Sequence, residues 1–162
     1  MIRLLARKTR SLVAQPPFLW AWLVPVWLGL GLARAGILTV AFRRLAPLFG
    51  RDAGILVWIP CIEAPDAGRA ALIHRTIAIA ARYTPWTANC FPQAIVAMLL
   101  LRLYGVPAAM YFGVARDTES GGMKAHAWVS AGPVTVCGGA SSFRSFSVVR
   151  TFIHPPAAIP TV

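Results

Sequence analysis

The sequence is poor in acidic residues and in charge generally. Only five Asp and Glu stand against sixteen Lys and Arg in 162 residues, which gives a formal net charge of +11. This excess of positive charge favours an anionic partner, namely a nucleic acid, a lipid surface or an acidic peptide. The basic residues are spread along the chain, and no Lys/Arg-rich run is interleaved with stacking aromatic residues. We therefore expect no nucleic-acid partner.

Cysteine is also scarce, and its count is odd. The three cysteines are Cys61, Cys90 and Cys137, and their spacing matches no metal-binding motif. A disulfide scaffold usually has an even number of cysteines, so a reducing compartment is the more natural setting. We expect a cytoplasmic protein with no metal, no other cofactor, and one thiol available as a nucleophile.

Apolar residues, in contrast, are abundant. Hydrophobic residues make up 57% of the chain and charged residues 13%. This is more apolar than a typical soluble domain, so a membrane contact or a large partner surface has to be considered. The length allows one domain with a proper core and is too short for two ordinary ones. We divide the chain into an apolar helical N-terminal segment, residues 1–50, and a domain over residues 51–162.

The N-terminal segment has three interpretations. Residues 11–33 carry no charge and follow the basic start MIRLLARKTR, which resembles a signal peptide with an Ala-Arg-Ala cleavage pattern. Residues 18–42 have the character of a membrane span that starts at an aromatic-rich interface. Pro25 in the middle of the run and Arg34 near its end oppose both interpretations. We favour a pair of short apolar helices that pack on the core or on a partner, with a membrane contact through residues 18–42 as the alternative.

The rest of the chain predicts an α+β fold in which a helix packs on a small antiparallel sheet. Apolar spacing marks the helices, alternation marks the strands, and Pro and Gly mark their ends. Thr87 or Asn89 is placed to cap the second helix, and Gly105 to end it in a left-handed conformation. The elements expected in order are a loop over residues 50–67, helices over 69–83 and 90–104, strands over 108–116, 125–131 and 134–139, and an irregular tail over 140–162.

A thiol at the start of a helix has catalytic potential. The partial positive charge of a helix N-terminus favours thiolate over thiol, and its free N–H groups can face an oxyanion. Cys90 is predicted at such a position, and His126 leads a strand directly downstream, so it is the best candidate for the base. A lone Cys in an apolar helix is also often a small buried hydrophobe, and a histidine between alanines can be a core residue.

The sequence around these two residues resembles the lasso-peptide biosynthesis B2 proteins of the transglutaminase-like superfamily. The resemblance is carried by NCFPQA at residues 89–94, LLRLYGVPA at 100–108, FGVAR at 112–116 and AHAWV at 125–129. These blocks stand in the family's order and at a suitable distance from one another. The similarity runs from about residue 69 to residue 146.

The resemblance implies a papain-like core and a cysteine peptidase that cleaves the leader from a lasso-peptide precursor. Cys90 would be the nucleophile and His126 the base, with Gln93 or Trp86 lining the pocket. The implied partners are the precursor leader peptide, a separate leader-recognition protein and an ATP-dependent lasso cyclase. Acyl transfer or amide hydrolysis on another substrate, and a non-catalytic scaffold that is membrane-attached, are the alternatives.

One position departs from the family pattern. The family has an Asp about a dozen residues after the histidine, as the third member of a triad, whereas this chain has Gly138. All five acidic residues precede His126. The orienting group would then be a backbone carbonyl, a serine (Ser141 or Ser142), or an acidic residue of the preceding loop (Asp117 or Glu119). The third group fixes the tautomer and the orientation of the imidazole, so its identity bears on catalysis.

Overall fold

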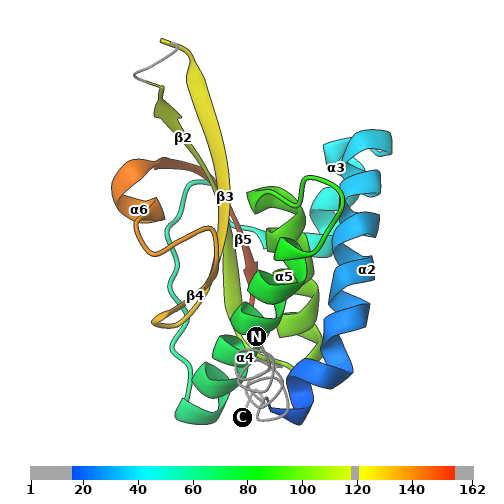
Figure 1. Cartoon of the computed structure of the whole chain (residues 1–162). Coiled ribbons are helices and arrows are strands. Elements are labelled where there is room, and N and C mark those ends of the chain that lie inside the picture. Colours follow the sequence, from blue (N-terminus) through cyan, green and yellow to red (C-terminus); the bar gives the residue numbers. More distant parts are fainter. Residues whose placement is uncertain (1–15, 118–120, 156–162) are drawn as a thin grey trace, which may run out of the picture.

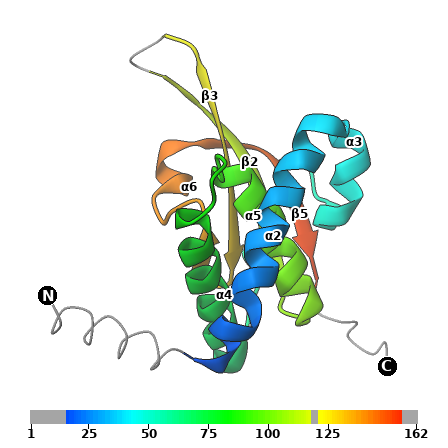
Figure 2. The ribbon, with the colours of Figure 1, turned by 45° about the vertical axis from the view of Figure 1, so that its right-hand side comes forward.

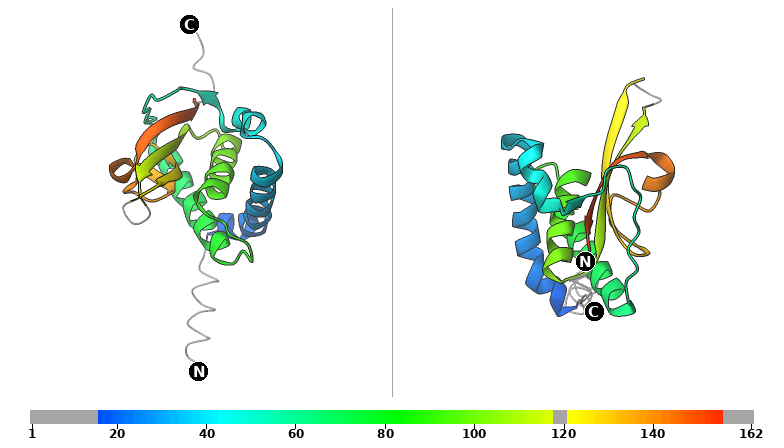
Figure 3. Two further views of the ribbon diagram at one scale, coloured as in Figure 1. Left: turned by 90° about the horizontal axis from the view of Figure 1, so that it is seen from above. Right: turned by 180° about the vertical axis from the view of Figure 1, so that it is seen from behind.

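The computed structural model describes residues 16–117 and 121–155. Five antiparallel strands form one sheet in the order β1-β5-β2-β3-β4 (Figure 1). The long helices cover one face of the sheet, and a short helix with an extended segment lies on the other face (Figure 3). The predicted α+β class, with helices packed on a small antiparallel sheet, is confirmed.

The elements follow in chain order. They are α2 (Pro17–Thr39), α3 (Phe42–Leu45), the 3-10 helix η1 (Ala46–Phe49), β1 (Arg51–Asp52), α4 (Ala64–Arg82), α5 (Cys90–Leu103), β2 (Ala108–Arg116), β3 (Met123–Ala131), β4 (Val134–Cys137), α6 (Ser142–Ser145) and β5 (Ser147–His154).

α5 is the central helix of the fold. It lies between the sheet and α2 (Figure 2), and Ala94, Ala97 and Leu101 are fully buried. Most of this helix is covered by protein, which explains why its sequence is mainly apolar, and Leu99 and Leu103 are its exposed apolar residues. It begins after Asn89 as predicted, and Gly105 follows its end with a φ of +68°. The prediction of this element is therefore confirmed nearly to its ends.

The predicted pair of short N-terminal helices is wrong, because α2 is one continuous helix of 23 residues. Proline removes one hydrogen bond and crowds the preceding turn, but Pro25 lies on the exposed side of α2. On the inner side Leu19, Val26 and Leu30 are buried against the core. This packing keeps the helix continuous through the proline.

Three side-chain hydrogen bonds to residues distant in sequence also attach α2 to the rest of the fold. Trp22 Nε1 donates to Tyr104 Oη at 2.6 Å. Trp27 Nε1 donates to the Tyr83 carbonyl at 3.0 Å, and Arg34 Nη1 to the Thr87 carbonyl at 2.9 Å. The charge of Arg34 was an argument against a membrane span, and the structure shows this side chain hydrogen-bonded to the main chain of the folded domain.

α2 is the one helix, within the part of the chain that the structure describes, that is long and apolar enough to cross a membrane. A core helix or a signal sequence passes the same test of length and composition. The basic start at residues 1–10 lies outside the described residues. The division of the chain at residue 50 stays a prediction.

The predicted irregular tail contains a strand, so that prediction is also wrong. β5 pairs with β1 on one side and with β2 on the other. Its sequence SVVRTFIH is rich in β-branched residues, and Thr151 and Phe152 are buried. The strand was not predicted because the surrounding composition is mixed and prolines follow it. Residues 156–162 lie outside the described part.

Candidate active site

Cys90 is the first residue of α5. Asn89 precedes it with extended backbone and makes no side-chain cap, and the first turn of the helix contains no acidic residue. N–H groups in the first turn of a helix have no partner inside the helix. The N–H groups of Cys90 and Phe91 are therefore suited to face an oxygen that gains negative charge.

One small open cavity lies between the start of α5 and the strands β2 and β3. Its volume is about 190 Å³, and Cys90 and His126 both lie on its wall. Both side chains are half-buried, so each is partly open to solvent. The other residues that line the cavity are Asn89, Phe91, Phe112, Ala125 and Ala127. The structure therefore places the expected nucleophile and the expected base on one cavity.

The ring of His126 is held by a main-chain carbonyl. Nε2 lies 2.8 Å from the Gly138 carbonyl oxygen. A carbonyl oxygen only accepts, so Nε2 carries the proton of the neutral imidazole and Nδ1 is left as the basic nitrogen. The rings of Phe146 and Trp128 stack on the imidazole, with centroids at 4.7 and 5.8 Å. Tautomer and orientation are thereby both fixed without a carboxylate.

The backbone at Gly138 explains why no aspartate stands there. Its φ is +89°, and an added Cβ would lie 2.3 Å from Trp128 Cβ and 2.9 Å from the Ala127 carbonyl oxygen. A side chain of any size is excluded from this conformation. The backbone points its carbonyl at His126 in place of a carboxylate.

Ser142 stabilises this turn through its hydroxyl group. Its Oγ lies 2.8 Å from the carbonyl oxygens of both Gly138 and Gly139, and the side chain is buried. A hydroxyl has one proton, so it donates to one carbonyl at a time. Ser142 was one of the predicted orienting groups, and the structure shows that it bonds to the orienting carbonyl rather than to the imidazole.

The predicted acidic candidate is placed elsewhere. Gly113 is the residue opposite His126, whereas Asp117 follows the last pair of the β2–β3 hairpin, Arg116 with Met123. Each residue advances a strand by about 3.3 Å, so roughly 13 Å of strand separates Asp117 from the level of His126. Glu119 lies outside the described residues.

Gln93 and Trp86 also face away from the Cys90 cavity. Gln93 Nε2 donates to the Ala88 carbonyl at 2.7 Å, and its side chain lines a neighbouring cavity with Gly138 and His74. The ring of Trp86 packs on Trp27 of α2, with centroids 4.7 Å apart. Their expected role in lining the nucleophile's pocket has no support in this geometry.

The three thiols have different surroundings. Cys61 is exposed in the segment between β1 and α4, Cys90 is half-buried, and Cys137 is buried at the end of β4. Burial, together with the nearby charge of Cys90, raises the pKa of the Cys137 thiol to about 12, although a hydrogen bond from the Val129 backbone opposes this. Cys137 is therefore protonated and inert at neutral pH.

Sequence reasoning missed the stacking residue Phe146, because it lies just before the strand that was interpreted as irregular tail. No group of three or more His, Cys, Asp and Glu side chains within residues 16–117 and 121–155 is arranged to hold a metal ion.

Comparison with known proteins gives one match. A family model described as the transglutaminase-like superfamily covers residues 36–151, which include both Cys90 and His126. No curated protein and no solved structure matches the chain. This superfamily includes transglutaminases and cysteine peptidases. The match spans most of the sequence, and the chain belongs to the transglutaminase-like superfamily.

Proposed function

We propose that the chain is a cysteine peptidase that removes the leader from a lasso-peptide precursor, before a partner cyclase closes the ring with ATP. The observation that supports a peptidase is the shared cavity of Cys90 and His126, with the imidazole held on the Gly138 carbonyl. The lasso assignment rests on the sequence blocks NCFPQA and AHAWV. The site itself would serve several acyl-transfer reactions.

The reaction needs only groups that border the cavity. Nδ1 of His126 takes the proton of the Cys90 thiol, and Sγ attacks the carbonyl carbon of the scissile peptide. The N–H groups at the start of α5 stabilise the oxyanion. His126 then gives its proton to the leaving amine, which frees the core peptide and leaves the leader as a thioester. Water, activated by the same imidazole, hydrolyses the thioester and restores the thiol.

A carbonyl in place of a carboxylate affects the rate. It fixes the tautomer as a carboxylate would, but it has no net charge to stabilise the imidazolium that forms during attack. We therefore propose slow turnover for the isolated chain. Delivery of the leader by a separate recognition protein would raise the effective concentration of the scissile bond. In this proposal the chain acts in the cytoplasm together with the recognition protein and the cyclase.

Cleavage of the precursor tests the proposal. The chain is incubated with a precursor peptide and recognition protein from the same gene neighbourhood, and the products are weighed by mass spectrometry. We expect one discrete leader fragment, and a loss of at least about 10³-fold in Cys90→Ala and in His126→Ala. Cys61→Ala, which changes an exposed thiol, is the matched control and should cleave normally.

The same assay separates the alternatives. Cleavage that persists in Cys90→Ala would overturn the nucleophile assignment. An inactive wild-type chain, with both partners present, would favour the non-catalytic scaffold, for which the missing carboxylate after His126 is the supporting observation. A product joined to an added amine, instead of a hydrolysed leader, would indicate acyl transfer.

A further inference from the structure

α2 has one charged side chain, Arg34, which bonds to the Thr87 carbonyl, and the outer face of the helix is apolar. Trp20, Val24, Leu28, Leu32 and Leu38 recur along it, and Leu32 and Leu38 are more than 70% exposed, at 74% and 71%. A water-facing side of a helix normally carries polar and charged residues, and a helix that is apolar all round is normally covered on all sides. The outer face of α2 therefore has the composition of a covered surface.

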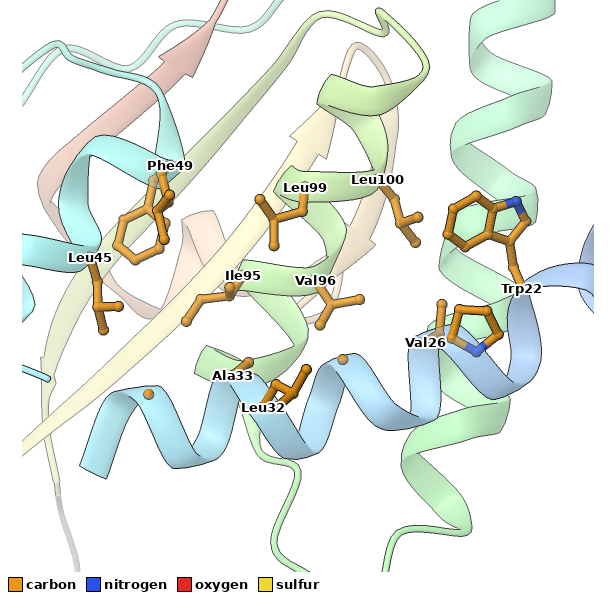
Figure 4. A pocket seen from close by; sticks show the side chains of 14 residues that line it. Trp22, Val26, Leu32, Ala33, Leu45, Phe49, Ile95, Val96, Leu99 and Leu100 are labelled. Atoms are coloured by element: carbon orange, nitrogen blue, oxygen red, sulfur yellow. The ribbon is translucent and has the colours of Figure 1, made fainter. Parts of the chain in front are cut away.

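An apolar groove extends this face. It has a volume of about 310 Å³ and lies between α2, α5 and the α3–η1 segment. Figure 4 shows the side chains of Leu32, Leu99 and Phe49 among those that line it. Leu32 belongs to both the face and the groove, and Leu48 and Leu99 on the groove are exposed by more than 40%. Face and groove therefore form one continuous apolar surface.

The stretch of chain that carries this surface on α2, α3 and η1 contains no acidic residue. The first 51 residues contain eight Lys and Arg and no Asp or Glu. Within this stretch Arg43 and Arg44 of α3 are exposed directly beyond the end of α2. An apolar face with the exposed Trp20 near one end and two exposed arginines beyond the other complements an anionic lipid surface.

The inner face of α2 excludes a spanning orientation for the folded chain. Leu19, Val26 and Leu30 are buried in the core, and Trp22 and Trp27 are hydrogen-bonded to it. A helix across the bilayer would have to break these contacts and present both faces to lipid. A helix that lies in the membrane plane keeps them and buries only its outer side.

We propose that α2 and the adjoining groove form a docking surface on which the folded protein binds an anionic membrane, with α2 parallel to the membrane plane. This binding site is separate from the Cys90–His126 cavity and does not depend on peptidase activity. On a membrane the core domain stays in the aqueous phase, with the sheet on the side of the helical layer away from the lipid.

Co-sedimentation with sucrose-loaded vesicles tests the proposal. The full chain is mixed with phosphatidylcholine vesicles or with vesicles that contain phosphatidylglycerol, and the bound fraction is measured. We expect binding to the anionic vesicles, reduced roughly tenfold or more by Leu28→Gln with Leu32→Gln, because two exposed leucines no longer enter the lipid. Arg43→Ser with Arg44→Ser should reduce anionic binding by roughly tenfold or more and leave weak neutral binding unchanged.

A matched control uses two exposed apolar residues away from α2. Ile55 and Leu56 are 76% and 60% exposed and belong to the segment between β1 and α4, which runs on the other side of the sheet (Figure 3). Ile55→Gln with Leu56→Gln should bind vesicles as the wild type does, and thermal unfolding should show that all three double variants are folded. No vesicle binding, or an equal loss in the control, would overturn the proposal. A dimer that the α2 variant dissociates, without vesicle binding, would do the same and would identify a protein interface instead.

Discussion

Two of the cavities that border α5 differ in how they are built. At its first turn, Cys90 faces a cavity of about 190 Å³ whose chemistry comes from one thiol and one imidazole. Further along, Ile95 and Leu99 face a groove of about 310 Å³ lined almost wholly by apolar atoms. The first depends on the backbone of a single turn at Gly138, and the second on many apolar side chains of similar kind. Substitutions should therefore affect the first sharply and the second gradually.

The largest effect is expected at the turn that holds His126. Gly138→Ala places a Cβ against Trp128 at a positive φ, and should lower the free energy of unfolding by about 3 kcal/mol through strain and overpacking. Gly139→Ala is the matched control, since its φ is +91° but no atom lies within 4 Å of the added Cβ. Gly139→Ala should lower the free energy of unfolding by about 1 kcal/mol. Denaturant unfolding measures both, and equal costs would contradict the geometry of this turn.

A pH-dependent effect is expected from Cys137, beside the same turn. Its pKa is raised to about 12 from 9.0, mainly by burial, so the folded protein favours the protonated thiol. This contribution to stability is complete below pH 9 and is lost as pH rises toward 12. The unfolding free energy of the wild type should therefore fall more steeply over that range than that of Cys137→Ala.

Tyr111, whose pKa burial also raises, titrates equally in both proteins and cancels in the comparison. Cys61→Ala is the control for an exposed thiol and should keep the wild-type slope. Identical slopes for the wild type and Cys137→Ala would show that Cys137 ionises freely in the folded state.

The smallest effects are expected on α2. An added Cβ at Gly29 would lie 3.5 Å from Val96, an ordinary contact, whereas at Gly31 it would lie 2.9 Å from the ring of Trp86. Gly29→Ala should stabilise the protein by about 0.5 kcal/mol through helix propensity, and Gly31→Ala should destabilise it by about 1 kcal/mol. Thermal unfolding of the two variants checks this prediction. An equal rise in stability for both would show that the Trp86 ring moves aside without loss of stability.

The sequence predicted the elements that carry local signals. The helix that starts at Cys90 has Asn89 before it and Gly105 after it, and β2 was predicted at its observed bounds. The single helix through Pro25 was not predictable, because buried contacts with α4 and α5, distant in sequence, hold its two halves together. β5 was missed for a related reason, since its pairing with β1 and β2 is non-local.

The site was predictable in part. The positions of Cys90 and His126 followed from helix and strand signals together with the family resemblance. A backbone carbonyl was among the predicted orienting groups of His126, but its residue was not predictable, because a carbonyl is present at every residue and only the φ of Gly138 selects this one. The predicted alternatives Asp117 and Ser142 had suitable chemistry, and their distance from the ring became known only with the register of the hairpin and the start of α6.

Alkylation of the three thiols tests the pairing of Cys90 with His126 most directly, and it needs no precursor peptide. The native protein is treated with iodoacetamide at neutral pH, and the modified peptides are quantified over time by mass spectrometry. We predict that Cys90 reacts faster than the exposed Cys61, that Cys137 is protected until the protein unfolds, and that His126→Ala slows Cys90 by roughly tenfold or more while Cys61 is unchanged. If Cys90 reacts no faster than Cys61, or reacts at the same rate without His126, the two residues do not form a nucleophile–base pair.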